Sequence, residues 1–127
     1  MIAITIPLQP ITKKNSQRIL RNKKTGRRFI APSEKYEQYE AQAGLFIRHK
    51  GININRPVNV KCLFYMGTRR KPDLNNLLEA VTDMLVTYNV LADDNANIVA
   101  AHDGSRVLYD KNNPRTEIYI TQMETGE

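Results

Sequence analysis

The spacing of hydrophobic residues along this chain predicts short strands and two longer helices. Runs of alternating or β-branched apolar residues, typical of strands, occupy residues 2–6, 58–66, 98–107 and 115–122. Residues 17–30 fit a basic β-hairpin with a turn at residues 22–26, although their alternation is poor.

Apolar residues at three- and four-residue spacing predict two amphipathic helices. The first should begin after Ser33, a favourable N-cap, and run to Gly51, a natural helix terminator. Its apolar stripe is Tyr36, Tyr39, Ala43, Phe46 and Ile47. The second should cover residues 73–88, with Pro72 and Asp73 at its start. Its stripe is Leu74, Leu77, Leu78, Val81, Met84, Leu85 and Tyr88.

The order of these elements favours an α+β fold. Two helices that each have one apolar face can cover one face of a mixed β-sheet, which gives a two-layer domain. A chain of 127 residues is long enough for one such core, so we expect a single domain over residues 1–127. The opposite face of so small a sheet is a candidate dimer surface.

Composition excludes several classes of protein. The longest apolar runs fall far short of a membrane span, and no charged leader precedes an apolar core at the N-terminus. The single cysteine, Cys62, excludes an internal disulfide framework and a cysteine-built zinc site. We therefore expect a soluble, cytoplasmic protein that does not associate with a membrane.

Positive charge is concentrated at the N-terminal end of the chain. Residues 1–33 contain no acid, whereas residues 34–127 contain eleven bases and thirteen acids. The bases of the first segment are Lys13, Lys14, Arg18, Arg21, Lys23, Lys24, Arg27 and Arg28. Such a basic segment is typical of nucleic-acid binding, and a solvated or disordered arm is the alternative. A membrane-surface role is disfavoured because the segment lacks an apolar stripe.

Carboxylates on both sides of the second helix suggest chemistry on phosphates. Three cations, residues 69–71, precede Asp73, and the pair Asp93–Asp94 follows the helix. Magnesium is commonly held by one or two carboxylates together with substrate phosphate, as in metal-dependent nucleases. The alternative is that Asp73 is only a helix cap and Asp93–Asp94 only an acidic turn. Because the two loops lie at opposite ends of the helix, convergence requires the chain to fold back after Tyr88 or a second subunit to complete the site.

The ordered set of motifs resembles the RusA family of Holliday junction resolvases. That family reads close to Asp-Leu-Asp-Asn-Leu, then Asp-x-Leu near the helix end, then Asp-Asp before a strand. The matching segments here are residues 72–77, 80–85, 93–94 and 98–99, together with Asn15-Ser16 before the basic segment and Pro32-Ser33 before a helix that carries Tyr36.

The resemblance implies a homodimeric endonuclease that depends on Mg²⁺, for which Mn²⁺ can substitute. Its implied substrate is branched DNA, especially four-way junctions, which it would resolve by paired nicks during recombination and repair. A bacterial cell with a prophage or phage origin is also implied. By position, the catalytic residues fall on Asp73, Asn75 and Asp94, and Asp93 joins them as a metal ligand.

Two residues depart from the family pattern. Asn75 replaces the second carboxylate, and Glu79 replaces a lysine found in some members. Three explanations remain open: Glu79 supplies the displaced acid from the same helix face, an amide oxygen is tolerated as a ligand, or the change inactivates the enzyme. Asp83 is a further auxiliary candidate, with a solvated helix face as the alternative.

We expect DNA contacts mainly from residues 13–28. The residues assigned to these contacts are Lys13, Lys14, Arg18, Arg21, Arg27 and Arg28, with Arg69, Arg70 and Lys71 near the scissile phosphate. Two rival hypotheses remain. One is a catalytically impaired DNA-binding protein of the same fold, and the other is a small protein-interaction domain with a solvated basic arm.

Overall fold

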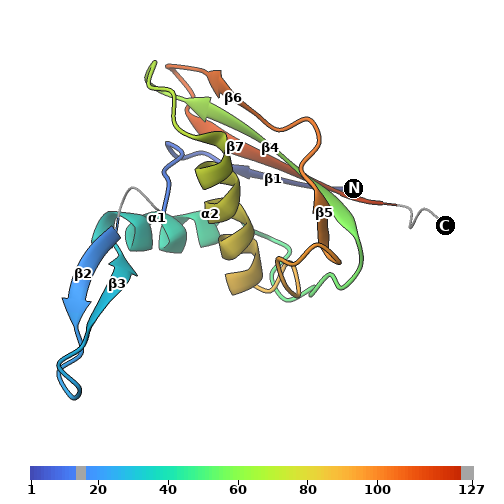
Figure 1. Cartoon of the computed structure of the whole chain (residues 1–127). Coiled ribbons are helices and arrows are strands. Elements are labelled where there is room, and N and C mark those ends of the chain that lie inside the picture. Colours follow the sequence, from blue (N-terminus) through green and yellow to red (C-terminus); the bar gives the residue numbers. More distant parts are fainter. Residues whose placement is uncertain (14–16, 124–127) are drawn as a thin grey trace.

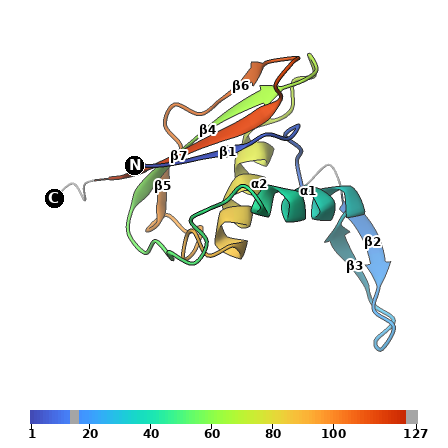
Figure 2. The ribbon, with the colours of Figure 1, turned by 180° about the vertical axis from the view of Figure 1, so that it is seen from behind.

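The computed structural model describes residues 1–13 and 17–123. A mixed sheet carries both helices on one face, and a separate two-stranded ribbon projects from the domain (Figures 1 and 2). The predicted two-layer α+β fold is therefore confirmed. Within the described ranges, neither helix is long and apolar enough to span a membrane.

Three strands form the antiparallel part of the sheet, in the order β1 (Ile2–Ile6), β7 (Arg115–Gln122) and β4 (Val58–Met66). Along β4, buried and half-buried residues alternate strictly, as the sequence pattern predicts for a strand with one face on the core. The other edge of β4 pairs in parallel with β5 (Val99–Ala101) and then with β6 (Arg106–Tyr109).

The prediction of a single strand at residues 98–107 is wrong, because this segment is divided into β5 and β6. Between them, side chains replace backbone pairing with β4. The His102 Nδ1 lies 2.8 Å from the Val60 carbonyl oxygen, and the Cys62 N–H donates to the Ser105 hydroxyl at 3.0 Å. Gly104 adopts a φ of +85°, a conformation that favours glycine, in the loop that leads from β5 to β6.

Helix α2 (Leu74–Thr87) agrees with the predicted second helix. The Asp73 side chain caps its start and accepts a 2.9 Å hydrogen bond from the Asn75 N–H. Its apolar face packs on the sheet, and Leu77 and Leu85 are almost completely buried. Full burial of each leucine side chain contributes about 1.5–3 kcal/mol, so this face holds the two layers together.

Helix α1 (Glu34–Gly44) begins as predicted, since the Tyr36 N–H donates to the Ser33 hydroxyl at 3.1 Å. Its expected end at Gly51 is wrong. After Gly44, backbone N–H groups bond to carbonyls three residues back, which tightens and then ends the helix. As a result Phe46 is exposed rather than part of the buried stripe, while Ile47 remains buried.

The ribbon consists of β2 (Gln17–Arg21) and β3 (Arg28–Pro32), paired antiparallel. It confirms the expected hairpin. The Asn22 side chain accepts hydrogen bonds from the N–H groups of Lys24 and Thr25, and Gly26 adopts a φ of +71°. The ribbon extends from the start of α1, away from the sheet (Figures 1 and 2).

Candidate active site

A groove of about 580 Å³ lies at the start of α2, where the loop after β4 meets the chain segment after β1. Asp73 lies in this groove together with three cations, Lys35, Arg70 and Lys71. The N-terminus of α2 adds the positive end of its dipole. One exposed carboxylate among several positive groups can hold a cation and a phosphate next to each other.

The loop between β4 and α2 is fixed at its base. The Gly67 N–H donates a 2.8 Å hydrogen bond to the Gln9 side chain, and a Cβ at this position would meet the same oxygen at 2.8 Å. Further along, the Arg69 guanidinium lies over the Tyr109 ring, 4.5 Å from its centroid. Arg69 therefore contacts the sheet, whereas Arg70 and Lys71 line the groove.

Asn75 and Glu79 are both exposed on α2, one helical turn apart. The structure thus places the two residues that depart from the family pattern on one accessible face, next to the Asp73 end of the helix. Asp83, one turn beyond Glu79, forms a 3.6 Å ion pair with Lys13. This pair links α2 to the chain segment that leads into the ribbon.

Asp93 and Asp94 lie in the turn that follows α2. The Asp93 carboxylate accepts a 2.7 Å hydrogen bond from the Asp94 N–H and a 3.1 Å bond from the Asn95 amide. These bonds, with that from the Asp94 backbone the strongest, lower the pKa of Asp93. Both oxygens of Asp93 thus shape the turn, and Asp94 is exposed beside it.

The structure does not bring Asp73 and Asp94 together within one chain. They lie beyond opposite ends of α2, whose 14 residues span about 21 Å at 1.5 Å per residue. Magnesium ligands lie only about 2.1 Å from the ion, so one ion cannot bridge such a separation.

The chain does not fold back toward Asp73 after the helix. Instead, the Ala92 N–H donates a 2.9 Å hydrogen bond to the Ile54 carbonyl, which holds the turn at the far end of the domain. In residues 1–13 and 17–123, no group of three His, Cys, Asp or Glu side chains is arranged to hold a metal ion. Folding back after Tyr88, one of the two routes to convergence that the sequence leaves open, is therefore not observed.

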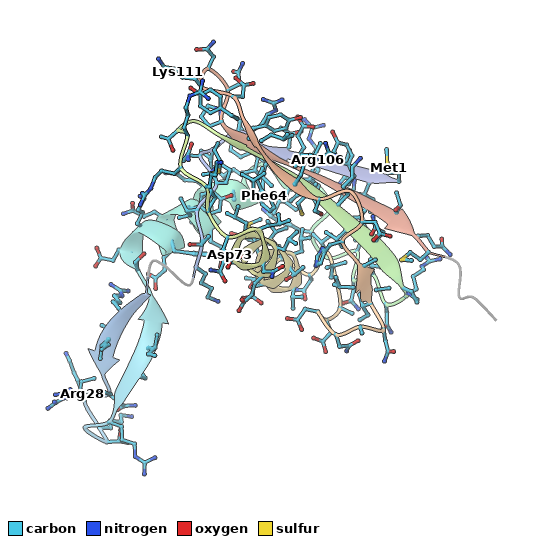
Figure 3. All side chains as sticks on the ribbon, turned by 45° about the horizontal axis from the view of Figure 1, so that its top comes forward. Met1, Arg28, Phe64, Asp73, Arg106 and Lys111 are labelled. Carbon is cyan, nitrogen blue, oxygen red and sulfur yellow. The ribbon has the colours of Figure 1, made fainter. Side chains whose placement is uncertain are left out.

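The structure divides the basic segment into two parts. Lys13 is paired with Asp83, and the Arg18 guanidinium bonds to Glu34 at 3.2 Å and Glu37 at 3.3 Å, which fastens the ribbon to the first turn of α1. The cations toward the tip of the ribbon are exposed, namely Arg21, Lys23, Lys24, Arg27 and Arg28. Arg28 lies far out on the ribbon in Figure 3, well separated from Asp73. Lys14 lies outside the described residues.

Sequence reasoning missed Lys35 as a member of the groove. It follows the N-cap of α1 by two residues, and only the packing of α1 beside the loop before α2 brings it near Asp73. The sequence pattern around Lys35 contains no signal for this proximity.

Comparison with known proteins supports the reading of the motifs. The family model described as Endodeoxyribonuclease RusA matches residues 7–121, which include both helices and the ribbon. A search of curated proteins found no match. The span of the family match confirms the resemblance that the ordered motifs suggest.

Proposed function

The chain belongs to the RusA family of endodeoxyribonucleases, which resolve Holliday junctions, and we propose from this that it nicks four-way DNA junctions using a divalent metal ion, Mg²⁺ or in its place Mn²⁺. The observation that supports the proposal most directly is the groove that places Asp73 beside Arg70, Lys71 and Lys35. We also assign the protein to the cytoplasm of a bacterial cell, with a phage or prophage origin and a role in DNA recombination and repair.

The proposed role of each site residue follows from its chemistry. Arg70 and Lys71 would bind the non-bridging oxygens of the scissile phosphate, and Lys35 would add charge from the opposite wall. Asp73, Asn75 and Asp94 would supply oxygen ligands, with Asp93 shaping the turn that presents Asp94. When bound, the metal ion supplies charge neutralisation at the phosphate and a means of positioning water.

A second copy of the chain would complete the site. In a two-fold dimer, contact between the Asp73 end of one α2 and the Asp94 end of the other is repeated by symmetry, which creates two equal sites. The two sites would be separated by roughly the length of α2, about 20 Å. Two equivalent sites on one dimer suit paired nicks in strands related by the symmetry of a four-way junction.

Mixing two inactive variants tests both catalysis and the shared site. We expect Asp73→Asn and Asp94→Asn each to abolish Mg²⁺-dependent nicking of a synthetic four-way junction. In a heterodimer of the two variants, one shared site carries both changes and the other is intact, so nicking of one strand should return. If each site lay within one chain, the mixture would stay inactive. Asp103→Asn, an exposed carboxylate in the loop between β5 and β6, is the matched control.

The second candidate is a DNA-binding protein that keeps the fold without hydrolysis. It is favoured by the amide at Asn75, where the family has a carboxylate. The same assay separates the two functions, because this alternative predicts junction binding with no nicking in either Mg²⁺ or Mn²⁺.

A further inference from the structure

One face of the ribbon combines exposed isoleucines with arginines. Ile19 and Ile30 are directly opposite each other across β2 and β3, and these residues are 70% and 67% exposed. Because strand side chains alternate, the neighbouring pair Arg21 and Arg28 lies on the same face. We call these four residues the isoleucine–arginine face.

This face is turned away from the rest of the domain. The opposite face of the ribbon carries Arg18, which is held to α1 by Glu34 and Glu37, together with the less exposed pair Leu20 and Phe29. The isoleucine–arginine face therefore lies on the side remote from α1, and the ribbon projects clear of the sheet (Figures 1 and 2).

The composition of the ribbon limits what can cover this face. Residues 17–32 contain six bases and no acid, so a second ribbon of the same charge would be repelled. A partner must offer apolar surface flanked by negative charge. DNA meets this requirement where stacking is interrupted, because base faces are then exposed between two lines of phosphates. A two-stranded ribbon also has the width that a DNA groove admits.

We infer that the isoleucine–arginine face inserts at the branch point of the junction, where Ile19 and Ile30 contact unstacked bases and Arg21 and Arg28 contact the flanking phosphates. This inference rests on the proposed function and deepens it, since it assigns recognition of the branch to an apolar contact. A continuous duplex offers phosphates but no exposed base faces, so the isoleucines would favour branched over linear DNA.

The test compares two double variants by binding to a four-way junction and to a linear duplex of the same sequence over a range of salt. Threonine keeps the β-branched shape and strand propensity, so Ile19→Thr/Ile30→Thr should preserve the ribbon. We expect it to reduce the preference for the junction about tenfold, as both isoleucines lose apolar contact, with binding to linear duplex and the salt dependence unchanged. Arg21→Gln/Arg28→Gln should instead weaken binding to both DNAs and lower the salt dependence.

A fluorescent base analogue at the branch point gives a second measurement. The unaltered protein should unstack the analogue and thereby increase the emission of the analogue. The Ile19→Thr/Ile30→Thr variant should not increase this emission. An unchanged junction preference or unchanged emission in this variant overturns the inference. Conversion of a dimer to a monomer by the same variant also overturns it, because the face would then bind a second copy. Absence of junction binding by the unaltered protein would instead refute the proposed function.

Discussion

The Tyr88 hydroxyl donates a 2.7 Å hydrogen bond to the backbone carbonyl of Glu40, and this bond joins the end of α2 to α1. Gly44 makes the contact possible, because a Cβ at this position would lie 2.5 Å from the same hydroxyl oxygen. A second bond, from the Tyr36 hydroxyl to the Ala80 carbonyl at 3.4 Å, joins the helices nearer the start of α1. The orientation of α1, and with it the position of Lys35 and the ribbon, therefore depends on close helix packing.

Gly44→Ala should destabilise the fold by about 1–3 kcal/mol, because the added methyl group overlaps the Tyr88 ring. Urea denaturation measures the effect. Tyr88→Ala removes the overlap, so the double variant should lose less stability than the two single losses combined. Simple additivity would contradict the assigned contact.

Asp73→Asn and Asp73→Ala separate the capping role of this residue from its proposed metal role. Asparagine is as good an N-cap as aspartate, so Asp73→Asn should keep the stability of α2 while nicking is lost. Asp73→Ala should lose nicking and also about 1 kcal/mol of stability. Thermal denaturation and the junction assay together make the comparison. Normal nicking by Asp73→Asn would show that Asp73 acts only as the N-cap of α2 and would contradict its metal role.

Asn75→Asp should increase Mg²⁺-dependent nicking, because a carboxylate binds this hard cation more strongly than an amide oxygen does. Glu79→Ala should decrease nicking if Glu79 supplies the displaced acid from the same face of α2. Rates at several Mg²⁺ concentrations show whether each change acts through metal affinity. An unchanged rate for Glu79→Ala would eliminate the displaced acid and leave Asn75 as a tolerated ligand.

Arg27→Gln/Arg28→Gln should weaken junction binding and leave the fold intact, since both side chains are exposed near the ribbon tip. Removal of two phosphate contacts should reduce the slope of log affinity against log salt by about 1.8. Arg18→Gln is the matched comparison, because its guanidinium binds Glu34 and Glu37. It should change ribbon position and cost at most about 1 kcal/mol, as is usual for partly exposed ion pairs. Equal salt slopes before and after the double change would argue against the DNA assignment.

Acid should weaken the contact between the end of β6 and the start of β7. The hydrogen bond from the Arg115 guanidinium, 2.9 Å from the Asp110 carboxylate, is the main cause that lowers the pKa of Asp110. The stabilisation is complete above the ordinary aspartate pKa near 4 and is lost as pH falls through the lower folded-state pKa.

Asp110→Asn tests this pH dependence. The variant should be less stable than the unaltered protein at neutral pH, and the difference should shrink as the pH falls below about 4. Urea midpoints at a series of pH values measure it. A constant difference down to pH 2 would show that the Asp110 carboxylate does not stabilise the fold through its charge.

Local patterns in the sequence were sufficient for the main elements of the fold. Residues 58–66 and 73–88 were predicted correctly, because their apolar periodicity is complete and a capping residue marks the start of the helix. The errors arose at element boundaries where residues distant in the sequence are in contact. At the end of α1, Gly44 packs against Tyr88 with no room for a Cβ, and where the predicted strand at residues 98–107 is divided, side chains bond to β4 in place of backbone groups.

The candidate site was predictable only in part. The family motifs predict Asp73, Asn75 and Asp94 as site residues, and the structure places Asp73 in a groove with cations. The sequence alone does not determine whether Asp73 and Asp94 meet, because that depends on where the turn after α2 is held, and in our proposal it also depends on a second chain. The sequence also did not predict that Lys35 lines the groove, because Lys35 comes near Asp73 only through the packing of α1.

The first turn of α1 has a consequence for where a junction would be cut. This single turn carries Glu34 and Glu37, which anchor the ribbon through Arg18, and between them Lys35, which lines the groove. A branch point bound by the ribbon would consequently lie at a fixed distance from the phosphate bound near Asp73. The first turn of α1 would then determine how many nucleotides separate the crossover from the incision.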